Sequence, residues 1–343
     1  MGFEGFPLFI TWELTFACNL RCHHCASSAG QEKINELTLD ESLKICSQFP
    51  DLLVQDVAFT GGEPLLRPDW SIIASYLRKQ DINTQIITNG LAVTPEIVAK
   101  IKEVELDVVG ISLDGLEKTH NYIRGHENLF QKVLDAIDLL INADIQITMI
   151  TTANMLNIEE IYPLFELFQS KGVNRWQIQP IFPLGRIHEA PELKLTEEGY
   201  MQLDESIQQW IPKDENINPK VFLPDSYGYF GELDTLELPW KGCNAGISSC
   251  GITSDGKIKG CLSLPDEFIE GDLRQQDLWD IWFHPDSFSY NRQFSKEDLG
   301  NYCYNCDKWE QCQGGCSAMS YGATERLHND PYCFYRIRKN MEP

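Results

Sequence analysis

Over the first 180 residues, the hydrophobic positions of the chain fall into two alternating patterns. Short apolar runs are separated by stretches in which apolar residues recur at helical spacing, and the combined unit repeats about every 30 residues, as strand–helix–strand units do. Runs that are apolar throughout are typical of strands buried on both faces of a parallel sheet. The predicted strands are residues 8–15, 54–60, 84–88, 107–113, 145–152 and 175–181, and the predicted helices are 39–46, 70–78, 95–103, 130–141, 159–170 and a further one within 191–210.

Six units of this kind predict an α/β fold, a partial (β/α)6 barrel of the TIM type. Periodicity alone leaves a doubly wound sheet open as the alternative. After the last unit the composition changes, because cysteine becomes frequent. We therefore expect a barrel in residues 1–215, a linker in 216–240 and a small cysteine-rich domain in 241–343.

Composition and charge limit the classes of function. The chain has 343 residues, with 28 Lys and Arg against 51 Asp and Glu, and a formal net charge of −23. Phosphate binding needs clustered cationic side chains, so no nucleic-acid partner is expected, and the acidity fits a solvated surface. No apolar run approaches the ~20 residues of a membrane span. The N-terminus lacks the features of a signal peptide, and we expect a cytoplasmic protein.

Twelve cysteines are unevenly distributed along the chain. Cys18, Cys22 and Cys25 lie together in CNLRCHHC, eight more lie between residues 243 and 333, and Cys46 occupies an apolar position of a predicted helix. Disulfides are not expected in a cytoplasmic protein. The Cys-x3-Cys-x2-Cys spacing after an apolar strand favours a [4Fe–4S] cluster with one iron left free for a non-protein ligand. A zinc loop and three unrelated thiols are the alternatives.

Glycine-rich and polar residues follow several of the predicted strands. In both architectures a ligand binds at the carboxyl ends of parallel strands, which makes these residues candidates for one site. Paired glycines expose backbone amides, a carboxylate beside them could accept from an ammonium group, and a hydroxyl and a carboxylate two residues apart could bind ribose. Each feature is also an ordinary turn signal, so it is their succession that favours a site. The strand-end candidates are Gly61, Gly62, Glu63, Pro64, Asn89, Ser112, Asp114 and Asn154.

Three segments carry a family resemblance: CNLRCHHC after WELT, then FTGGEPLLRPDW, then ISLDG followed by HNYIRG. Together they resemble the radical S-adenosylmethionine (SAM) superfamily. The resemblance implies that Cys18, Cys22 and Cys25 bind a [4Fe–4S] cluster whose open iron is chelated by SAM. It also implies reductive cleavage of SAM to a 5′-deoxyadenosyl radical, which abstracts hydrogen from the substrate. His24 stands where the family usually has an aromatic residue.

The same resemblance assigns roles to the strand-end residues. The segment Gly61–Pro64 would hold the amino group of SAM, and Arg124 would lie near its carboxylate. Contacts to the ribose would come from Ser112, Asp114 and Asn154. Asn89, at the end of another strand, completes the predicted SAM-binding set, while no catalytic acid or base is identified by the sequence.

The cysteines after residue 242 form a second motif. Their spacing follows Cys-x12-Gly-x4-Cys and then Cys-x2-Cys-x5-Cys-x3-Cys, with zinc ribbons as the alternative to iron–sulfur sites. This spacing resembles the SPASM extension of peptide-modifying radical SAM proteins. The resemblance implies three [4Fe–4S] clusters in all, two of them auxiliary. One auxiliary set is Cys243, Cys261 and Cys316 with Cys250 as either the fourth ligand or a free thiol, and the other is Cys303, Cys306, Cys312 and Cys333.

The combined resemblance implies an enzyme that modifies a ribosomally made peptide, by forming a cross-link or by epimerising a residue. Within the family, the alternatives are a maturase of a folded protein, of the sulfatase-maturing type, and an enzyme acting on a haem precursor. Outside enzymes, the alternative is an iron–sulfur electron carrier or scaffold. The expected partners are the precursor peptide, an electron donor such as flavodoxin or ferredoxin, and a separate leader-binding protein, because no winged recognition domain precedes the first strand.

An aromatic segment lies within the expected linker. Tyr227, Tyr229 and Phe230 are interspersed with Gly228 and Gly231. The pattern fits a wall that faces the substrate and equally a packed connection between domains.

Overall fold

The computed structural model of the chain describes residues 5–210, 218–229 and 242–341. Within these residues ten strands form a single sheet, in the order β10-β9-β8-β1-β2-β3-β4-β5-β6-β7. Neighbours from β8 through β1 to β7 are parallel, whereas β8, β9 and β10 pair in antiparallel fashion. The strands are β1 (Phe9–Thr15), β2 (Asp56–Gly61), β3 (Asn83–Thr88), β4 (Val108–Ser112), β5 (Ile147–Ala153), β6 (Arg175–Pro180), β7 (Lys220–Phe222), β8 (Ser249–Ile252), β9 (Lys257–Lys259) and β10 (Ile269–Asp272).

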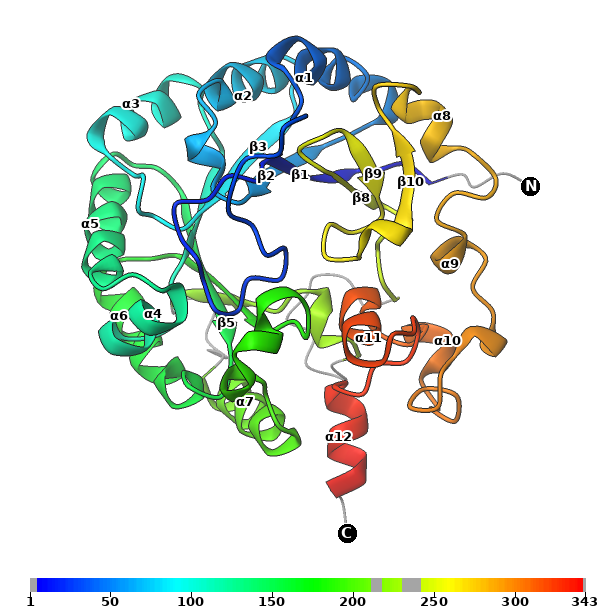
Figure 1. Cartoon of the computed structure of the whole chain (residues 1–343). Coiled ribbons are helices and arrows are strands. Elements are labelled where there is room, and N and C mark those ends of the chain that lie inside the picture. Colours follow the sequence, from blue (N-terminus) through cyan, green and yellow to red (C-terminus); the bar gives the residue numbers. More distant parts are fainter. Residues whose placement is uncertain (1–4, 211–217, 230–241, 342–343) are drawn as a thin grey trace.

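Helices form an outer ring around the parallel strands (Figure 1). Their starts are encoded locally: Thr38 and Glu41 make the capping box predicted for α1, and Thr94 caps α3 with a proline at its first turn. The α/β partial barrel predicted from the hydrophobic pattern is confirmed. The helices of the ring are α1 (Leu39–Cys46), α2 (Trp70–Arg78), α3 (Pro95–Glu103), α4 (Glu117–Arg124), α5 (Leu129–Asn142), α6 (Ile161–Ser170) and α7 (Glu197–Trp210).

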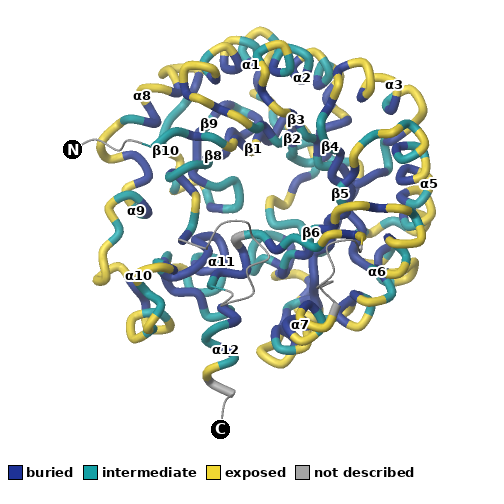
Figure 2. The backbone as a smooth tube through the Cα atoms, turned by 180° about the vertical axis from the view of Figure 1, so that it is seen from behind, coloured by how far each residue is buried: buried dark blue, intermediate teal, exposed yellow. Residues whose placement is uncertain are grey.

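Alternate residues of a strand serve opposite faces of the sheet. On β1, Trp12 is fully buried and packs edge-on against Phe49, with ring centroids 6.1 Å apart. Its neighbours Thr11 and Glu13 face the concave side and line a cavity there, as does Gln179 on β6. The prediction of strands that are apolar on both faces is therefore wrong for β1 and β6, because their concave face borders cavities and not a core. Figure 2 shows the buried residues following the strands and the inner sides of the helices.

The C-terminal region continues the barrel sheet. Strand β8 pairs with β1, so that Cys250 lies opposite Ile10 across the ladder. Behind β8, the antiparallel β9 and β10 extend the sheet to its edge, and the last helix returns to lie beside α7 (Figure 1). The helices of this region are α8 (Leu278–Trp282), α9 (Ser289–Arg292), α10 (Trp309–Cys312), α11 (Ser317–Thr324) and α12 (Phe334–Met341).

Two elements of the barrel are not predicted by the sequence. Strand β7 lies within the expected linker 216–240 and pairs with β6, so part of that segment belongs to the sheet, and a run of three residues is too short to predict a strand. Helix α4 has only His120 and Ile123 buried, which leaves no apolar stripe to predict it. No described helix has both the length and the apolar character needed to cross a membrane.

Candidate active site

The three N-terminal thiols lie on the loop that follows β1, at the carboxyl ends of the parallel strands. The amide of Cys18 donates to the carbonyl of Gly30 (2.7 Å), which closes the loop on itself. The buried Arg186 holds it from the other side, since its Nε donates to the carbonyl of Cys22 (2.8 Å). Cys18, Cys22 and Cys25 all line one cavity. Arg186 could not be predicted, because it lies more than 160 residues away in sequence.

The glycine pair at the end of β2 lies directly against the cysteine loop. A Cβ on Gly61, whose φ is +142°, would lie 2.2 Å from the carbonyl oxygen of Thr15. A Cβ on Gly62 would lie 2.1 Å from the carbonyl oxygen of Ala17. Only glycine allows this approach, and the Gly62 amide uses it to donate to Thr15 (2.8 Å).

The cavity beside the three thiols has a volume of about 290 Å³. Five of the nine residues predicted to bind SAM line it: Gly61, Gly62, Asn89, Ser112 and Arg124. Sequence reasoning missed the others that line it because they carry no motif and come from strand interiors or distant loops. These include His24, Thr88, Thr152, Gln177, Gln179, Phe182 and Arg186.

Glu63 does not line this cavity. Its carboxylate is fully buried and accepts from the amide of Leu65 (3.2 Å), the hydroxyl of Thr88 (2.8 Å) and the amide of Asn89 (2.8 Å). Burial raises the pKa of Glu63 to about 7, although these three donors oppose the shift. Glu63 therefore joins the ends of β2 and β3 and positions Asn89 at the cavity wall, while its neighbour Pro64 is buried beside it.

Asp114 is also turned away from the cavity, into a buried network. One oxygen lies 2.6 Å from Nε of Arg124 and 3.3 Å from Nε2 of His24, and the other accepts from the amide of Thr152 (2.8 Å). Burial raises the pKa of Asp114, but the cationic Arg124 dominates and holds it at about 2. Arg124 is thereby fixed at the cavity wall, with Nη1 3.9 Å from the sulfur of Cys22. Asp114 acts as the anchor of Arg124, where the sequence predicts a ribose contact.

Asn154 is likewise occupied within its own turn. Its Oδ1 accepts from the amide of Leu156 (3.0 Å) and its Nδ2 donates to the carbonyl of Thr152 (2.9 Å). The side chain is fully buried and does not line the cavity. For this residue the structure supports the turn signal that was the alternative interpretation.

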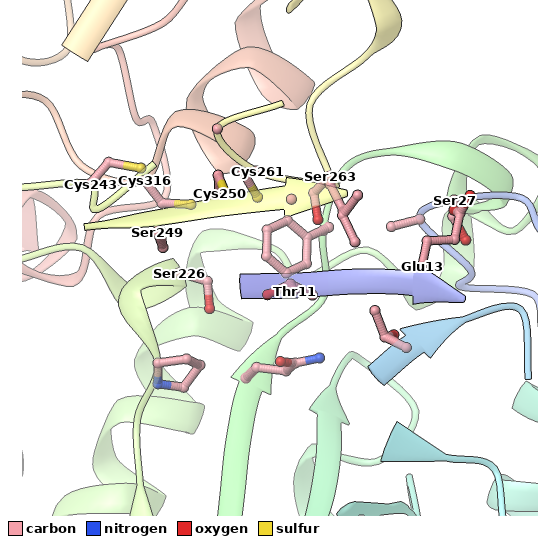
Figure 3. Close-up of a pocket in the computed structure, with 18 of the residues that line it drawn as sticks. Thr11, Glu13, Ser27, Ser226, Cys243, Ser249, Cys250, Cys261, Ser263 and Cys316 are labelled. Carbon is pink, nitrogen blue, oxygen red and sulfur yellow. The ribbon is translucent and has the colours of Figure 1, made fainter. Parts of the chain in front are cut away.

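A second and larger cavity, of about 580 Å³, extends from the first one toward the C-terminal region. Figure 3 shows four cysteine side chains gathered at one end of it and Glu13 with Ser27 at the other. The cysteines are Cys243, Cys250, Cys261 and Cys316. The two cavities have a common wall made by Ala26, Thr60, Gly61, Gln179 and Phe182.

Cys250 differs from the other three thiols of this set. It lies on β8, inside the sheet, and burial raises its pKa to about 12. Burial also raises the pKa of Cys316, and the neighbouring Cys243 and Cys261 raise it further, which places these three close together. All four face the same cavity, so the structure does not separate a ligand from a free thiol at Cys250.

The remaining predicted set converges on a third, small cavity. Cys303, Cys306, Cys312 and Cys333 all line it, together with aromatic side chains from the end of the chain. Cys316 lies with Cys243 and not with this set, although only three residues separate it from Cys312. The structure thus brings the cysteines together in the two interleaved groups that the resemblance implies.

The donor chemistry of these sites fits iron–sulfur clusters. In the described part of the chain, no three His, Cys, Asp or Glu side chains converge closely enough to hold one metal ion, as a zinc site requires. Thiols instead surround cavities, which suits a cube with iron at separate corners. Burial raises the pKa of several of these thiols, among them Cys18 to about 11 and Cys303 to about 12, so binding of a cluster must displace protons.

The aromatic segment predicted as a substrate wall is only partly described, because Phe230 and Gly231 lie outside the described residues. Tyr227 is buried and its ring lies 5.0 Å from that of Phe334 on α12. Tyr229 lines the third cavity and meets Tyr335 edge-on at 5.2 Å. These contacts favour packing between the barrel and α12 over a wall that faces the substrate.

Family models match both parts of the chain. The radical SAM superfamily model matches residues 12–168, and the SPASM model, an iron–sulfur cluster-binding domain, matches residues 243–307. Both matched regions contain thiols that line the cavities described above. The chain belongs to the radical SAM superfamily and carries a SPASM domain. Iron–sulfur clusters and SAM are therefore its cofactors.

Relatives cover almost the full length of this radical SAM chain. The AdoMet-dependent heme synthase of Methanosarcina barkeri is 32% identical over 97% of this chain and 98% of its own length. The mycofactocin maturase MftC of Mycolicibacterium smegmatis is 29% identical over 95% of this chain and 82% of its own length. The similarity thus extends through both domains in relatives of two kinds.

Solved structures confirm the fold. The structure of anSMEcpe with bound AdoMet matches with a TM-score of 0.76 and 18% identity, over 96% of this chain and 94% of that one. Streptococcus suis SuiB bound to its precursor peptide SuiA matches with a TM-score of 0.78 and 19% identity, over 97% and 77%. At these identities the likeness concerns the fold alone.

Proposed function

We propose that this chain is a radical SAM enzyme with three [4Fe–4S] clusters, one bound by Cys18, Cys22 and Cys25 and two by the SPASM cysteines. With SAM, the first cluster supplies a 5′-deoxyadenosyl radical that can remove a hydrogen atom from an unactivated carbon. The enzyme would use it to oxidise or rearrange a substrate held in the larger cavity. Flavodoxin or ferredoxin would serve as the electron donor.

The common wall of the two cavities is the observation that carries this proposal. Gly61, Thr60 and Gln179 border both the cavity beside the first three thiols and the cavity that contains Cys243, Cys261 and Cys316. A substrate in the larger cavity would lie between the source of the radical and an auxiliary cluster. That position suits a cluster that accepts an electron from the substrate after hydrogen abstraction.

The protein side chains of the smaller cavity fit the polar groups of SAM. Arg124 presents a guanidinium that is held by Asp114 and can pair with a carboxylate. Hydroxyl and amide groups of Thr88, Asn89 and Ser112 line the same space and can bond to ribose or to the amino group. The roles predicted for Arg124 and Ser112 thus have side chains in suitable places, whereas Asp114 and Glu63 would act by holding those side chains in position.

The cluster assignment is tested by iron analysis of reconstituted protein. Three clusters correspond to about 12 iron atoms per chain, and each cluster-deficient variant should lose about four. Cys22→Ala should also abolish formation of 5′-deoxyadenosine on reduction with SAM present. Cys46→Ala is the matched control, because Cys46 is a buried thiol that lines none of the three cavities. Full iron content in Cys22→Ala would reject the assignment, and so would full activity.

Cys250 needs a separate test. If it is a ligand, Cys250→Ala should change the electron paramagnetic resonance spectrum of one auxiliary cluster and lower the iron content. If it is a free thiol, the spectrum and the iron content should equal those of the wild type, and the ligand assignment would be wrong.

A peptide is the substrate that we infer first. Among the described residues that line the larger cavity, none is Lys, Arg or His, and most of the polar groups are hydroxyls such as Thr11, Ser226 and Ser263. Neutral hydrogen-bonding groups suit a peptide backbone, while several carboxylates buried there would lack cationic partners. The similarity to the mycofactocin maturase supports this class, with a cross-link or an epimerised residue as product. A separate leader-binding protein would then present the peptide.

A haem precursor is the second candidate, because the relative that is 32% identical over nearly the full length is a heme synthase. The two candidates are separated by incubating the reduced enzyme with SAM and either an iron porphyrin that carries propionates or short peptides encoded beside the gene. Mass change of the peptide, with the porphyrin unaltered, supports the peptide. Decarboxylated porphyrin with unaltered peptide would overturn it. Absence of 5′-deoxyadenosine under all conditions would instead favour an electron carrier.

A further inference from the structure

One carboxylate stands out in the larger cavity. Among the described residues that line it, Glu13 is the only acidic or basic side chain. Glu13 lies on β1, opposite Thr60 of the wall common to both cavities. Its side chain is only 9% exposed, although a carboxylate at such depth costs free energy unless it is paired.

The two oxygens of Glu13 have different environments. Oε1 accepts from the hydroxyl of Ser254 (2.8 Å), the amide of Ser254 (3.1 Å) and Nζ of Lys33 (3.3 Å). Oε2 has no hydrogen-bond partner among the described residues, and it is not enclosed by protein atoms. The first oxygen fixes the side chain in place, and the second is left open to the cavity. Figure 3 shows Glu13 beside Ser27, at the end of the cavity away from the cysteines.

Lys33 does not satisfy the second oxygen. Its Nζ is divided between Glu13 (3.3 Å) and Asp255 (3.3 Å), and Asp255 does not line the cavity. Burial lowers the pKa of Lys33, but the two carboxylates outweigh it and keep the ammonium charged. One shared cation facing two carboxylates leaves an excess negative charge, and the open side of that charge is in the cavity.

We propose that Glu13 is a substrate-recognition residue, whose Oε2 accepts a hydrogen bond from a cationic N–H group of the substrate. An ammonium or guanidinium group has the donor and the charge that this oxygen lacks, and a charge-assisted bond of this kind is stronger than a neutral one. The inference rests on the proposed function in one respect, that the larger cavity holds the substrate. It adds that the bound segment carries a Lys or Arg side chain or a free amino group.

The test measures binding, without reductant, so that it does not depend on turnover. Two blocked tripeptides serve as probes, one with arginine between alanines and one with citrulline in its place, which has the same shape without the charge. Their dissociation constants are measured by calorimetry on cluster-loaded, SAM-bound protein. Wild type should bind the arginine peptide about tenfold more tightly than the citrulline peptide, since a hydrogen bond to a charged group is worth about 1.5 kcal/mol or more.

Two variants of equal charge distinguish the cavity from the surface. Glu13→Gln keeps the size of the side chain and should bind both peptides alike. Asp255→Asn removes the other carboxylate from the same lysine, outside the cavity, and should keep the preference for arginine. Iron content reports whether each variant is folded.

Three results would overturn the inference. They are equal binding of both peptides by the wild type, a preference that survives in Glu13→Gln, and loss of the preference in Asp255→Asn as well. The wild-type comparison stands even if a variant fails to fold. If no 5′-deoxyadenosine forms on reduction, the proposed function fails while the binding result still decides the role of Glu13.

Discussion

At the scale of single residues, the site depends on buried charges that hold one another in place. Asp114 is fully buried and Arg124 nearly so, and the pair connects the end of β4 to α4. Pairs of this kind add little net stability as a whole, but removal of one partner leaves an uncompensated buried charge. The cost of that removal is what a variant can measure.

We expect Asp114→Asn to destabilise the protein by about 3–5 kcal/mol, because it leaves the guanidinium of Arg124 buried without a counter-ion. It should also weaken SAM binding, since Arg124 loses its anchor. The free energy of unfolding in urea and the SAM dissociation constant are the measurements. The control is Asp138→Asn, whose pair with Lys171 is largely exposed and is worth at most about 1 kcal/mol. Equal small losses in both variants would contradict the prediction.

Glu63 gives a prediction about pH. Burial raises its pKa to about 7 in the folded protein, whereas an unfolded carboxyl titrates near 4.3, about its model value. Between these values the folded state holds a proton that the unfolded state has lost, so stability should fall as pH rises through this window and then level off. Below both values Glu63 contributes no pH dependence.

The measurement is the unfolding free energy of cluster-free protein at a series of pH values from about 4 to 8, for wild type and Glu63→Gln. The variant cannot titrate at this position, so its stability should fall less over the window than that of the wild type. Subtracting the two curves removes the other groups that titrate there. Parallel curves would show that Glu63 is ionised in the folded state at low pH as it is in the unfolded chain.

At the scale of elements, the end of β2 and the cysteine loop form one unit. Gly62 approaches the carbonyl of Ala17, and the amide of Glu63 donates to the same carbonyl (2.8 Å). This contact sets the distance between the loop that carries Cys18 and the strand ends that line the cavity. The glycine pair is thus required for close packing of two backbones, in addition to any contact with a ligand.

Gly62→Ala should displace the cysteine loop, because the new methyl group would lie 2.1 Å from a backbone oxygen that has little freedom to move. We expect loss of about four iron atoms per chain and of SAM binding. Gly30→Ala, on the same loop, meets no atom within 4 Å and should change stability by no more than about 0.5 kcal/mol. Iron analysis and equilibrium dialysis with SAM test both variants. Retention of iron by Gly62→Ala would show that the loop can adapt.

The sequence predicts elements well where their signals are local. The bounds of α2 and α3 agree with the prediction, because capping and apolar spacing lie within each helix. Helix α4 and strand β7 are formed by contacts with distant segments and leave no such signal. The same distinction applies to the fold, which was predicted because its repeat is regular along the chain.

For the site, the sequence identifies which residues follow strands but not the direction of their side chains. Glu63 and Asp114 turn inward because Thr88 and Arg124, 25 and 10 residues further on, supply the donors that hold them. Glu13 had no motif of its own and is singled out only by the cavity that it faces. The grouping of the cysteines, by contrast, followed from a spacing that the family shares.

At the scale of the whole molecule, the SPASM region is attached to the barrel at two places. Strand β8 pairs with β1, and α12 returns to α7 through an ion pair in which Nε of Arg338 lies 2.5 Å from Asp204. Asp204 is 2% exposed and Arg338 about a quarter exposed. Helix α12 begins directly after Cys333, which lines the third cavity. The second attachment therefore bears on the cluster proposed there.

Arg338→Ala should loosen this attachment, because it leaves the carboxylate of Asp204 buried without its partner. We expect a loss of about 2–3 kcal/mol, less than for a fully buried pair since Arg338 is partly exposed. Amide hydrogen exchange in α12 should become faster, and a chelator should remove the iron of the second auxiliary cluster sooner than that of the other two. Lys339→Ala is the control on the same helix, because its pair with Asp307 has both side chains more than half exposed and is worth at most about 1 kcal/mol. If the two variants exchanged and lost iron at equal rates, α12 would be held by packing alone, and Tyr227 against Phe334 would be the contact to remove next.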